Sequence, residues 1–349
     1  MDRHLINESA SLLDALKQLN TLSGQVMTLL VTNDDGVMTG TLTDGDVRRG
    51  LLNGVSLESP ITNAMHREFR WLRENSCDVA ALREMRNQGI RLVPMLDADG
   101  KVCRIIDTCV TKTILPVSAI LMAGGKGERL RPMTLTVPKP LLKVGDKAII
   151  DYNIESLARV GVERITVTTN YLAEQLDEHF ASPVAGVKVE CVRETKPLGT
   201  IGSVALVNLP DEGDTIVMNS DLLTTISFED MYLRHEEEKA DITIAAVPYN
   251  VSVPYAILGT EGALVRSLEE KPSYSYYANA GIYIISNKLL RGLKPDERVD
   301  ATDLIESAIA DGKKVTYFPI NGTWIDIGSP SDFRHAQELM KHIQLTRDN

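Results

Sequence analysis

The 349-residue sequence is poor in cysteine and in aromatic residues, and it contains no long apolar run. No segment approaches the roughly 18 consecutive apolar residues of a membrane-spanning helix, and the polar first residues lack the apolar core of a signal peptide. The four cysteines, Cys77, Cys103, Cys109 and Cys191, show neither CxxC spacing nor a pairing pattern. Reduced thiols are therefore favoured over a metal or disulfide framework, and we expect a cytoplasmic protein without a membrane span.

Basic residues are also in deficit, with 37 Lys and Arg against 48 Asp and Glu and a net charge of −11. Nucleic acid and anionic lipid are thereby excluded as general partners, because both require a positive surface. The length predicts two domains. Pro116 cannot continue a helix, and an apolar strand is predicted from Ala119 onward. We place the domains at residues 1–115 and 118–349.

The first half contains an internal repeat of 64 residues. An apolar, β-branched run at residues 26–32 ends at an Asn-Asp-Asp-Gly turn, and a similar run at residues 90–96 ends at Asp-Ala-Asp-Gly. A second strand follows each turn, and amphipathic helices are predicted to flank each hairpin. The pattern indicates helix–strand–strand–helix, occurring twice.

This arrangement resembles a tandem pair of CBS (cystathionine-β-synthase) motifs, an α+β module. In that family a Gly, a Thr or Ser, and an Asp hold the ribose and phosphate of an adenine nucleotide; here they would be Gly40, Thr43 and Asp46. An aspartate can accept from ribose hydroxyls, and a threonine can donate to phosphate. The equivalent positions of the second repeat are Arg104, Asp107 and Val110. The resemblance therefore implies at most one nucleotide site, and a dimerisation module without a ligand is the alternative.

The second half opens with a glycine-rich loop directly after a predicted strand. Gly124, Gly125 and Gly127 allow close backbone approach, so that their N–H groups can converge on an anion. A P-loop is excluded because Lys126 is followed by glycine rather than by Ser or Thr. A dinucleotide-binding fingerprint is excluded because Pro132 interrupts the helix that would have to follow.

Positive charge gathers around this loop, although the protein as a whole is acidic. Between positions 124 and 147 lie two acidic residues and six basic ones, namely Lys126, Arg129, Arg131, Lys139, Lys143 and Lys147. Pro138 and Pro140 flank Lys139 and restrict how its side chain is presented. The segment thus favours a polyanionic ligand over the plain alternative of a surface turn.

Residues 121–141, LMAGGKGERLRPMTLTVPKPL, resemble the signature of sugar-1-phosphate nucleotidyltransferases. Further motifs follow in that family's order within residues 118–345: residues 194–200, 219–221, 269–272, 279–281 and 324–328. The resemblance implies an α/β domain of the Rossmann-like, GT-A-like class, with a mixed, mostly parallel sheet covered by helices.

Two aspartates are the candidate metal ligands. Asp221 follows a short apolar strand, at the end where open α/β sheets bind ligands, and Asp326 is bracketed by apolar residues, an unusual place for an unpaired charge. Mg²⁺ prefers one or two carboxylates together with substrate phosphates. The family resemblance assigns both aspartates to one Mg²⁺, whereas Asp221 taken alone would be a turn or helix-cap residue.

The resemblance also implies roles for the remaining site residues. Lys271 would contact the sugar phosphate, Glu270 would accept from sugar hydroxyls, and Asn279 and Gly281 would lie beside the sugar ring. Taken alone, residues 268–272 are typical of a solvated charged surface. We assign Arg129 to the β- and γ-phosphates and Lys139 to the sugar-phosphate side. The expected nucleotide-binding residues are Leu121, Ala123, Gly124, Gly125, Gly127, Glu194, Gly199 and Thr200.

The choice of base depends on Glu194. Guanine offers N1–H and N2–H as adjacent donors to a carboxylate, whereas an amide suits uracil or thymine better. The surrounding residues resemble those of mannose-1-phosphate guanylyltransferases, and a fused CBS pair resembles enzymes that make GDP-glucosamine. We expect GTP with glucosamine 1-phosphate or mannose 1-phosphate as substrates, Mg²⁺ as cofactor, and a homo-oligomer. Uridylyl, cytidylyl and thymidylyl transfer, and a silent nucleotide-sensing subunit, remain alternatives.

Overall fold

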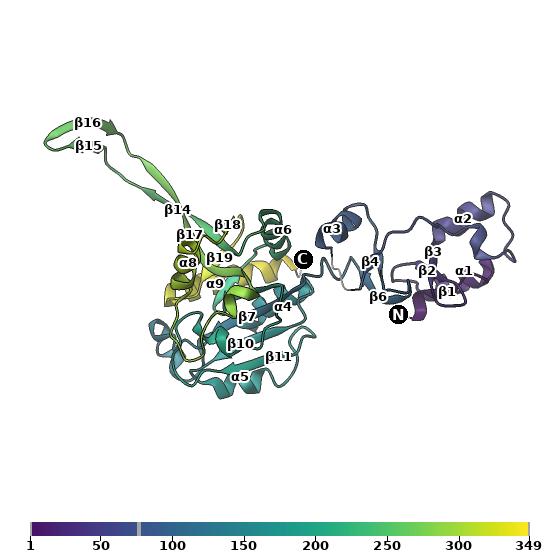
Figure 1. Cartoon of the computed structure of the whole chain (residues 1–349), viewed down its shortest axis with the longest axis horizontal. Coiled ribbons are helices and arrows are strands. Elements are labelled where there is room, and N and C mark those ends of the chain that lie inside the picture. The colour runs from purple at the N-terminus through teal and green to yellow at the C-terminus, as the bar shows by residue number, and fades with distance from the viewer. Residues whose placement is uncertain (1, 75–77, 348–349) are drawn as a thin grey trace. The chain divides into compact units, whose positions relative to one another are not determined.

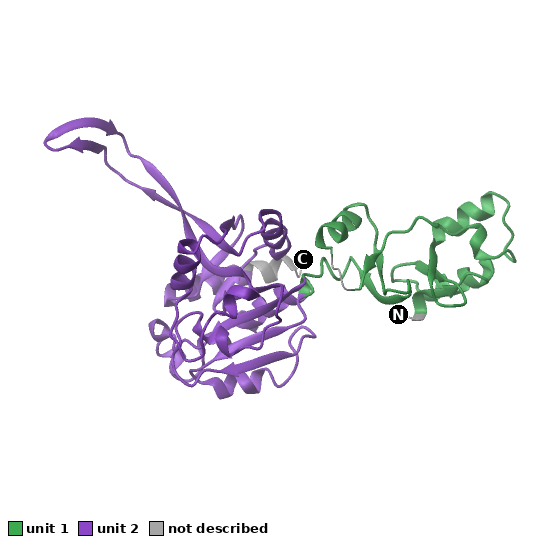
Figure 2. Cartoon of the chain, viewed as in Figure 1, with its two compact units in different colours: residues 1–115, 159–161 green, residues 116–158, 162–349 purple. Residues whose placement is uncertain are grey.

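The computed structural model describes residues 2–74 and 78–347, so that Cys77 lies outside the described residues. The chain forms two compact units, residues 1–115 with 159–161 and residues 116–158 with 162–349 (Figure 2). Cys103, Cys109 and Cys191 are free thiols. Among the described residues, no helix combines the length and the apolar character that a membrane span requires.

Unit 1 contains two three-stranded sheets with the same strand arrangement. In each, the first strand runs parallel to the second, and the second forms an antiparallel hairpin with the third. The strands are β1 (Leu5–Asn7), β2 (Thr28–Thr32) and β3 (Met38–Thr43) in the first sheet and β4 (Leu72–Arg73), β5 (Leu92–Leu96) and β6 (Val102–Asp107) in the second. The helices are α1 (Leu12–Thr21), α2 (Asp44–Leu52) and α3 (Val79–Asn87).

The two repeats differ after their hairpins. α2 follows β3 and begins with a capping box, in which Thr43 and Asp46 satisfy each other's backbone N–H groups. After β6, turns and irregular chain over residues 108–116 stand where a second closing helix is predicted. That prediction is wrong, and the composition explains why: Thr108, Val110 and Thr111 are β-branched residues of low helix propensity.

Unit 2 is built on a seven-stranded sheet in the order β11-β10-β7-β12-β17-β14-β18 (Figure 1). The strands are β7 (Val117–Ala123), β10 (Ile165–Thr169), β11 (Val189–Arg193), β12 (Asp214–Asn219), β14 (Ile242–Ser252), β17 (Ser273–Ser286) and β18 (Val315–Pro319). β17 alone among these seven runs antiparallel to its neighbours. The prediction of a mixed, mostly parallel sheet is confirmed.

Side chains of both sheet faces are buried, as in most parallel sheets. On one face, Ile120 of β7 and Val217 of β12 share a core with Ile305, which belongs to a helix over residues 301–310. The helices of the unit are α4 (Ile149–Arg159), α5 (Ala173–His179), α6 (Phe228–Glu238), α7 (Asn287–Leu290), α8 (Ala301–Ala310) and α9 (Pro330–Arg347).

The strand order reverses at β7, and this reversal positions the site. From β7 the chain continues to β10 and β11 on one side and then returns to β12 on the other side of β7. Met122 lies opposite Asn219 in the parallel pair β7–β12, so the segments after both strands leave the same edge of the sheet. In open α/β folds this switch point is where ligands bind.

Two small sheets lie beside this edge. They pair β13 (Leu222–Thr224) with β19 (Trp324–Asp326) and β8 (Lys143–Val144) with β9 (Lys147–Ala148). Leu223 and Ile325 of the first small sheet share a core with Leu130 and Ile149. The segment after β12 and the segment containing Asp326 are therefore held together.

An arm projects from the main sheet of unit 2 (Figure 1). β14 and β17 continue beyond the other strands as a two-stranded ribbon, and β15 (Ile257–Glu261) and β16 (Leu264–Glu269) form its tip. We define the arm as residues 248–277. Most of its side chains are exposed.

Candidate functional site

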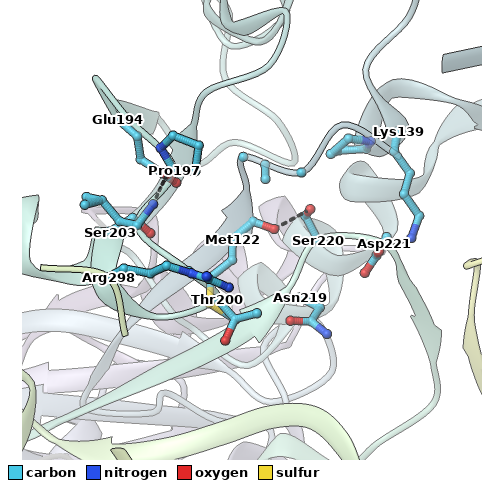
Figure 3. A pocket seen from close by; sticks show the side chains of 16 residues that line it. Met122, Lys139, Glu194, Pro197, Thr200, Ser203, Asn219, Ser220, Asp221 and Arg298 are labelled. Atoms are coloured by element: carbon cyan, nitrogen blue, oxygen red, sulfur yellow. Dashed lines mark hydrogen bonds and ion pairs between the residues drawn. The ribbon is translucent and has the colours of Figure 1, made fainter. Parts of the chain in front are cut away.

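A cavity of about 450 Å³ lies at the switch point of the unit 2 sheet (Figure 3). Its walls come from the ends of β7 and β12, from the segment around Lys139 and from the turn at residues 197–200. Of the predicted site residues, those that line it are Ala123, Gly124, Gly125, Lys139, Glu194, Gly199, Thr200 and Asp221. The volume is in the usual range for a small-molecule site.

The glycine loop leaves β7 and folds back on itself. Gly127 has φ +60, and a Cβ there would lie 3.0 Å from Thr134 Cγ2 and 3.2 Å from Lys139 Cβ. The Thr134 hydroxyl donates to the Gly127 carbonyl at 2.8 Å. Three 3₁₀ turns follow in place of a helix: Glu128–Leu130, Met133–Leu135 and Lys139–Leu141. Glycine at position 127 thus lets the loop pack closely against the segment that carries Lys139.

Asp221 and Asp326 come together across the β13–β19 sheet. Leu222 is paired with Asp326, and the backbone N–H of Ile327 donates to the Asp221 carbonyl at 3.2 Å. The ammonium group of Lys139 pairs with Asp221 and lies 3.8 Å from a carboxylate oxygen of Asp326. One lysine therefore lies next to both carboxylates.

These carboxylates fit a hard divalent cation. Asp221 Oδ1 is buried and has no hydrogen-bond partner among the described residues, although Oδ2 is paired with Lys139. A buried oxygen without a partner is costly unless a ligand satisfies it. No cluster of three or more metal-ligating side chains occurs in the described ranges. Two carboxylates that leave the other coordination positions to phosphate and water suit Mg²⁺.

Asp326 is partly buried and lies near the carboxylate of Asp221. Burial and the like charge of Asp221 raise its pKa, while Lys139 and Arg129 act in the opposite direction. Arg129 also packs against Gly328, where a Cβ would lie 2.9 Å from its Nη2. Arg129 is thus placed beside the carboxylates, although it does not line the cavity in the described residues.

Glu194 lies in the wall of the cavity beside the glycine loop. Its side chain is 8% exposed, and one carboxylate oxygen accepts the backbone N–H of Leu198 at 3.3 Å. A Cβ on Gly124 would lie 2.6 Å from the other oxygen. Burial raises the pKa of Glu194, and the hydrogen bonds from Leu198 and Ser203 partly offset this.

The turn at residues 197–200 is fixed against the start of α8. The backbone N–H of Thr200 donates to Asp300 Oδ1 at 2.9 Å, and the Thr200 hydroxyl accepts from Ala301 N–H at 2.7 Å. Gly199 has φ +83, and a Cβ there would lie 2.4 Å from the Val299 carbonyl oxygen. Thr200 and Gly199 therefore shape the cavity wall by anchoring it to a helix.

Three residues without a predicted role also line the cavity, namely Arg298, Ser203 and Ser220. Arg298 belongs to an irregular segment with no motif, and only its proximity to the cap residue Asp300 hints at its position. Ser220 donates to the Met122 carbonyl through both its N–H, at 3.3 Å, and its hydroxyl, at 2.7 Å. These bonds hold Asp221 next to the glycine loop.

The residues predicted to contact the sugar lie in two separate places, beside the cavity and on the arm. Gly281 has φ +70, and a Cβ there would lie 2.4 Å from the side chain of Asn219, which lines the cavity. Asn279 accepts the N–H of Gly281 at 2.9 Å. Glu270 and Lys271 instead are exposed on the arm, and no arm residue is among the described residues that line the cavity. Leu121 is fully buried in β7 and does not line it either.

Unit 1 has a cavity of its own, of about 560 Å³. Thr43 lines it, whereas Gly40 and Asp46 do not belong to the described lining. The Asp46 carboxylate instead accepts the N–H of Thr43 at 2.8 Å and its hydroxyl at 2.6 Å, and it pairs with Arg49. Cationic side chains of this lining are Arg70 and Arg91.

Known proteins resemble the second unit. Mannose-1-phosphate guanylyltransferase catalytic subunit beta of Danio rerio is 31% identical over 226 residues, which are 62% of this chain and 62% of that protein. D-glycero-alpha-D-manno-heptose 1-phosphate guanylyltransferase of Aneurinibacillus thermoaerophilus is 28% identical over 229 residues, covering 65% of this chain and 99% of that protein.

A solved structure also resembles this unit. The crystal structure of HddC from Yersinia pseudotuberculosis superimposes with a TM-score of 0.51 at 25% identity, covering 64% of this chain and 99% of that one. The family model described as Nucleotidyl transferase matches residues 118–342, which contain the glycine loop, both aspartates and all of the sheet except Val117. This chain belongs to the nucleotidyl transferase family.

Proposed function

We propose that unit 2 transfers the guanylyl group of GTP to a hexose 1-phosphate, giving a GDP-sugar and diphosphate. The observation that carries this proposal is the position of Asp221. It lies at the carboxyl end of β12 beside the glycine loop, paired with Lys139, close to Asp326, and with one buried oxygen available to a ligand. With a divalent cation held by the two carboxylates, this arrangement would neutralise and orient a nucleoside triphosphate.

The reaction needs charge neutralisation more than a general base. The phosphate oxygen of the sugar is already anionic near neutral pH and attacks the α-phosphorus, while the bond from that phosphorus to the β-phosphate oxygen breaks. In our proposal Arg129 and the loop N–H groups bind the β- and γ-phosphates, and Lys139 offsets repulsion between the anions. Mg²⁺ held by Asp221 and Asp326 would polarise the α-phosphate.

Guanine is the base that Glu194 supports. Its carboxylate is held in the cavity wall by Leu198, and an ionised carboxylate can accept from N1–H and N2–H together. Relatives named for guanylyl transfer to mannose 1-phosphate and to a heptose 1-phosphate support the same base. For the acceptor we propose glucosamine 1-phosphate first and mannose 1-phosphate second.

For unit 1 we propose a CBS pair that binds an adenine nucleotide in the cavity lined by Thr43. The guanidinium groups of Arg70 and Arg91 supply donors for a phosphate there. Calorimetric titration of the full chain with AMP and with ATP tests this. Heat that is lost in Arg70→Ala is the expected result; no heat with either nucleotide would leave an assembly role.

Diphosphate release across the four common NTPs and several sugar 1-phosphates tests the catalytic proposal. We expect release that requires Mg²⁺ and is greatest with GTP. Greater release with UTP, CTP or dTTP would change the base but keep the reaction. No release with any pair would favour the silent nucleotide-sensing subunit.

A further inference from the structure

The arm is an amphipathic ribbon with an apolar face that the described part of its own chain leaves exposed. In the antiparallel register, Tyr249 is paired with Tyr276 and Val251 with Tyr274, so these four side chains share one face. They are 61%, 58%, 39% and 37% exposed, respectively. We call this set the tyrosine face.

Beyond its base, where Pro248 is paired with Tyr277 and the Tyr277 ring packs against Tyr317, the opposite face of the ribbon is polar. Asn250 is paired with Ser275 and Ser252 with Ser273 in the same ladder, and each pair is joined by a side-chain hydrogen bond, at 2.6 and 3.2 Å. A two-stranded ribbon is marginally stable in water by itself, and an exposed apolar face on it indicates a binding surface. The arm also holds five of the chain's ten tyrosines, a residue type enriched in protein interfaces.

The arm also holds Glu270 and Lys271, two residues predicted to contact the substrate, away from the unit 2 cavity of the same chain. The ladder between β14 and β17 is continuous from Asn279 to Ser273, six residue steps or about 20 Å of extended chain. Glu270 and Lys271 lie beyond Ser273, so Lys271 could reach the cavity of its own chain only if this ladder were broken. The cavity is therefore without the lysine assigned to the sugar phosphate.

Charge identifies a second copy of this chain as the occupant of the tyrosine face. The arm has three carboxylates, Glu261, Glu269 and Glu270, of which the last two are adjacent and directly precede Lys271. Beside the cavity, exposed Lys126 and Arg129 offer cations to the adjacent carboxylates Glu269 and Glu270.

We propose that the arm of one copy docks through its tyrosine face on a second copy and presents Glu270 and Lys271 to the cavity of that copy. Each active site is then shared between two chains, with Asp221 from one and Lys271 from the other. In a two-fold dimer the exchange is reciprocal. This inference rests on the proposed function for the role of Lys271, but the docking of the arm does not.

Mixed dimers test the sharing of sites. Full-length Lys271→Ala and Asp221→Asn chains with different affinity tags are co-expressed, and dimers carrying both tags are isolated. Each single variant is expected to lose at least about 100-fold in diphosphate release, as for removal of a fixed charged donor. The mixed dimer is expected to regain about half of the wild-type rate, because one of its two sites is intact.

Controls make this result specific. A mixed dimer of Lys271→Ala with the double variant Asp221→Asn, Lys271→Ala has no intact site and should stay inactive, while Lys188→Ala, an exposed lysine away from the arm, should keep wild-type activity. An active wild type with a mixed dimer no better than its parents would overturn the sharing of sites. Wild-type activity in Lys271→Ala would overturn the role of the arm.

Cross-linking tests the docking itself, independently of activity. Tyr276, 58% exposed, is replaced with the photoreactive amino acid p-benzoylphenylalanine, and Ile309 on α8, also 58% exposed, serves as the matched control. We expect a covalent dimer from position 276 and none from position 309. Only monomers from position 276 would overturn the docking. A wild type inactive with every substrate, together with a dimer from position 276, would refute the proposed function and keep the arm interface.

Discussion

Lys139 and Asp221 form an ion pair at the carboxyl end of β12, with side chains only 11% and 21% exposed. The same ammonium group lies 3.8 Å from Asp326, so it stands where a divalent cation would also be attracted. A metal and this lysine therefore compete for one pair of carboxylates. In the proposed reaction, Lys139 turns to the substrate phosphates when the metal binds.

Replacing Lys139 with methionine should change metal affinity and turnover in opposite directions. Loss of the competing cation is expected to tighten Mn²⁺ binding to the nucleotide-free protein by about tenfold, which corresponds to about 1.4 kcal/mol. Diphosphate release is expected to fall by about 100-fold or more, because a fixed positive charge is lost from the site. Electron paramagnetic resonance and a release assay measure the two effects. Weaker Mn²⁺ binding in Lys139→Met would contradict this account; Lys188→Met, on an exposed lysine, is the control.

Protonation of Glu194 should lower the activity with GTP at acid pH. Burial raises its pKa, and guanine recognition requires the ionised form, so kcat/KM for GTP should fall as the pH drops through a value above the ordinary range of glutamate. Glu194→Gln is expected to remove this pH dependence and to lower kcat/KM for GTP by about 10- to 100-fold. The ratio of kcat/KM for UTP to kcat/KM for GTP should rise. Glu190→Gln, an exposed residue of β11, should change none of these. An unaltered pH profile in Glu194→Gln would refute the assignment.

Substitution of Gly124 and of Gly125 tests separately whether the loop packs against Glu194 and whether it binds the nucleotide. A Cβ at Gly124 would lie 2.6 Å from Glu194 Oε1, whereas one at Gly125 meets nothing within 4 Å in the described chain. Gly124→Ala should therefore lower the Tm and raise the KM for GTP by about tenfold or more. Gly125→Ala should leave the Tm unchanged and still raise the KM, since phosphates approach the loop backbone closely. An unchanged KM in both variants would mean that the loop does not bind the nucleotide.

The turn beside α8 offers a second matched pair. Gly199 and Gly186 both have left-handed φ angles, of +83 and +80, but only a Cβ at Gly199 meets backbone, 2.4 Å from the Val299 carbonyl oxygen. Gly186→Ala is expected to cost about 1–2 kcal/mol of unfolding free energy from the φ angle alone. Gly199→Ala should cost clearly more, as measured by denaturant unfolding. Equal costs would show that the turn can move away from α8.

Much of the sheet and of the polar site could be predicted from local patterns. A buried apolar strand followed by glycines, and a short strand followed by Asp221, both place function at the carboxyl end of a sheet, and the structure brings these two strands side by side. The mostly parallel sheet was implied by the family resemblance rather than by these local patterns. Pro132 correctly excluded a helix after the loop.

What the sequence could not predict depends on long-range geometry. Arg298 reaches the cavity because its segment packs on the turn at residues 197–200, a contact with no local signature. Lys271 was assigned to the sugar phosphate by resemblance alone, and the arm holds it away from its own cavity. The tyrosines at positions 249, 274 and 276 were a signal for the arm, but only the strand register shows that two of them are paired and that all share one face.

The central claim is that Asp221 and Asp326 hold one divalent cation for the transfer. The most direct test is diphosphate release from GTP and a sugar 1-phosphate as Mn²⁺ is varied, in the wild type, Asp221→Asn, Asp326→Asn and the exposed control Asp311→Asn. We predict no measurable release in Asp221→Asn at any Mn²⁺ concentration, at least about a tenfold higher half-saturating Mn²⁺ in Asp326→Asn, and wild-type behaviour in the control. Wild-type rate and wild-type Mn²⁺ dependence in either of the first two variants would contradict the account.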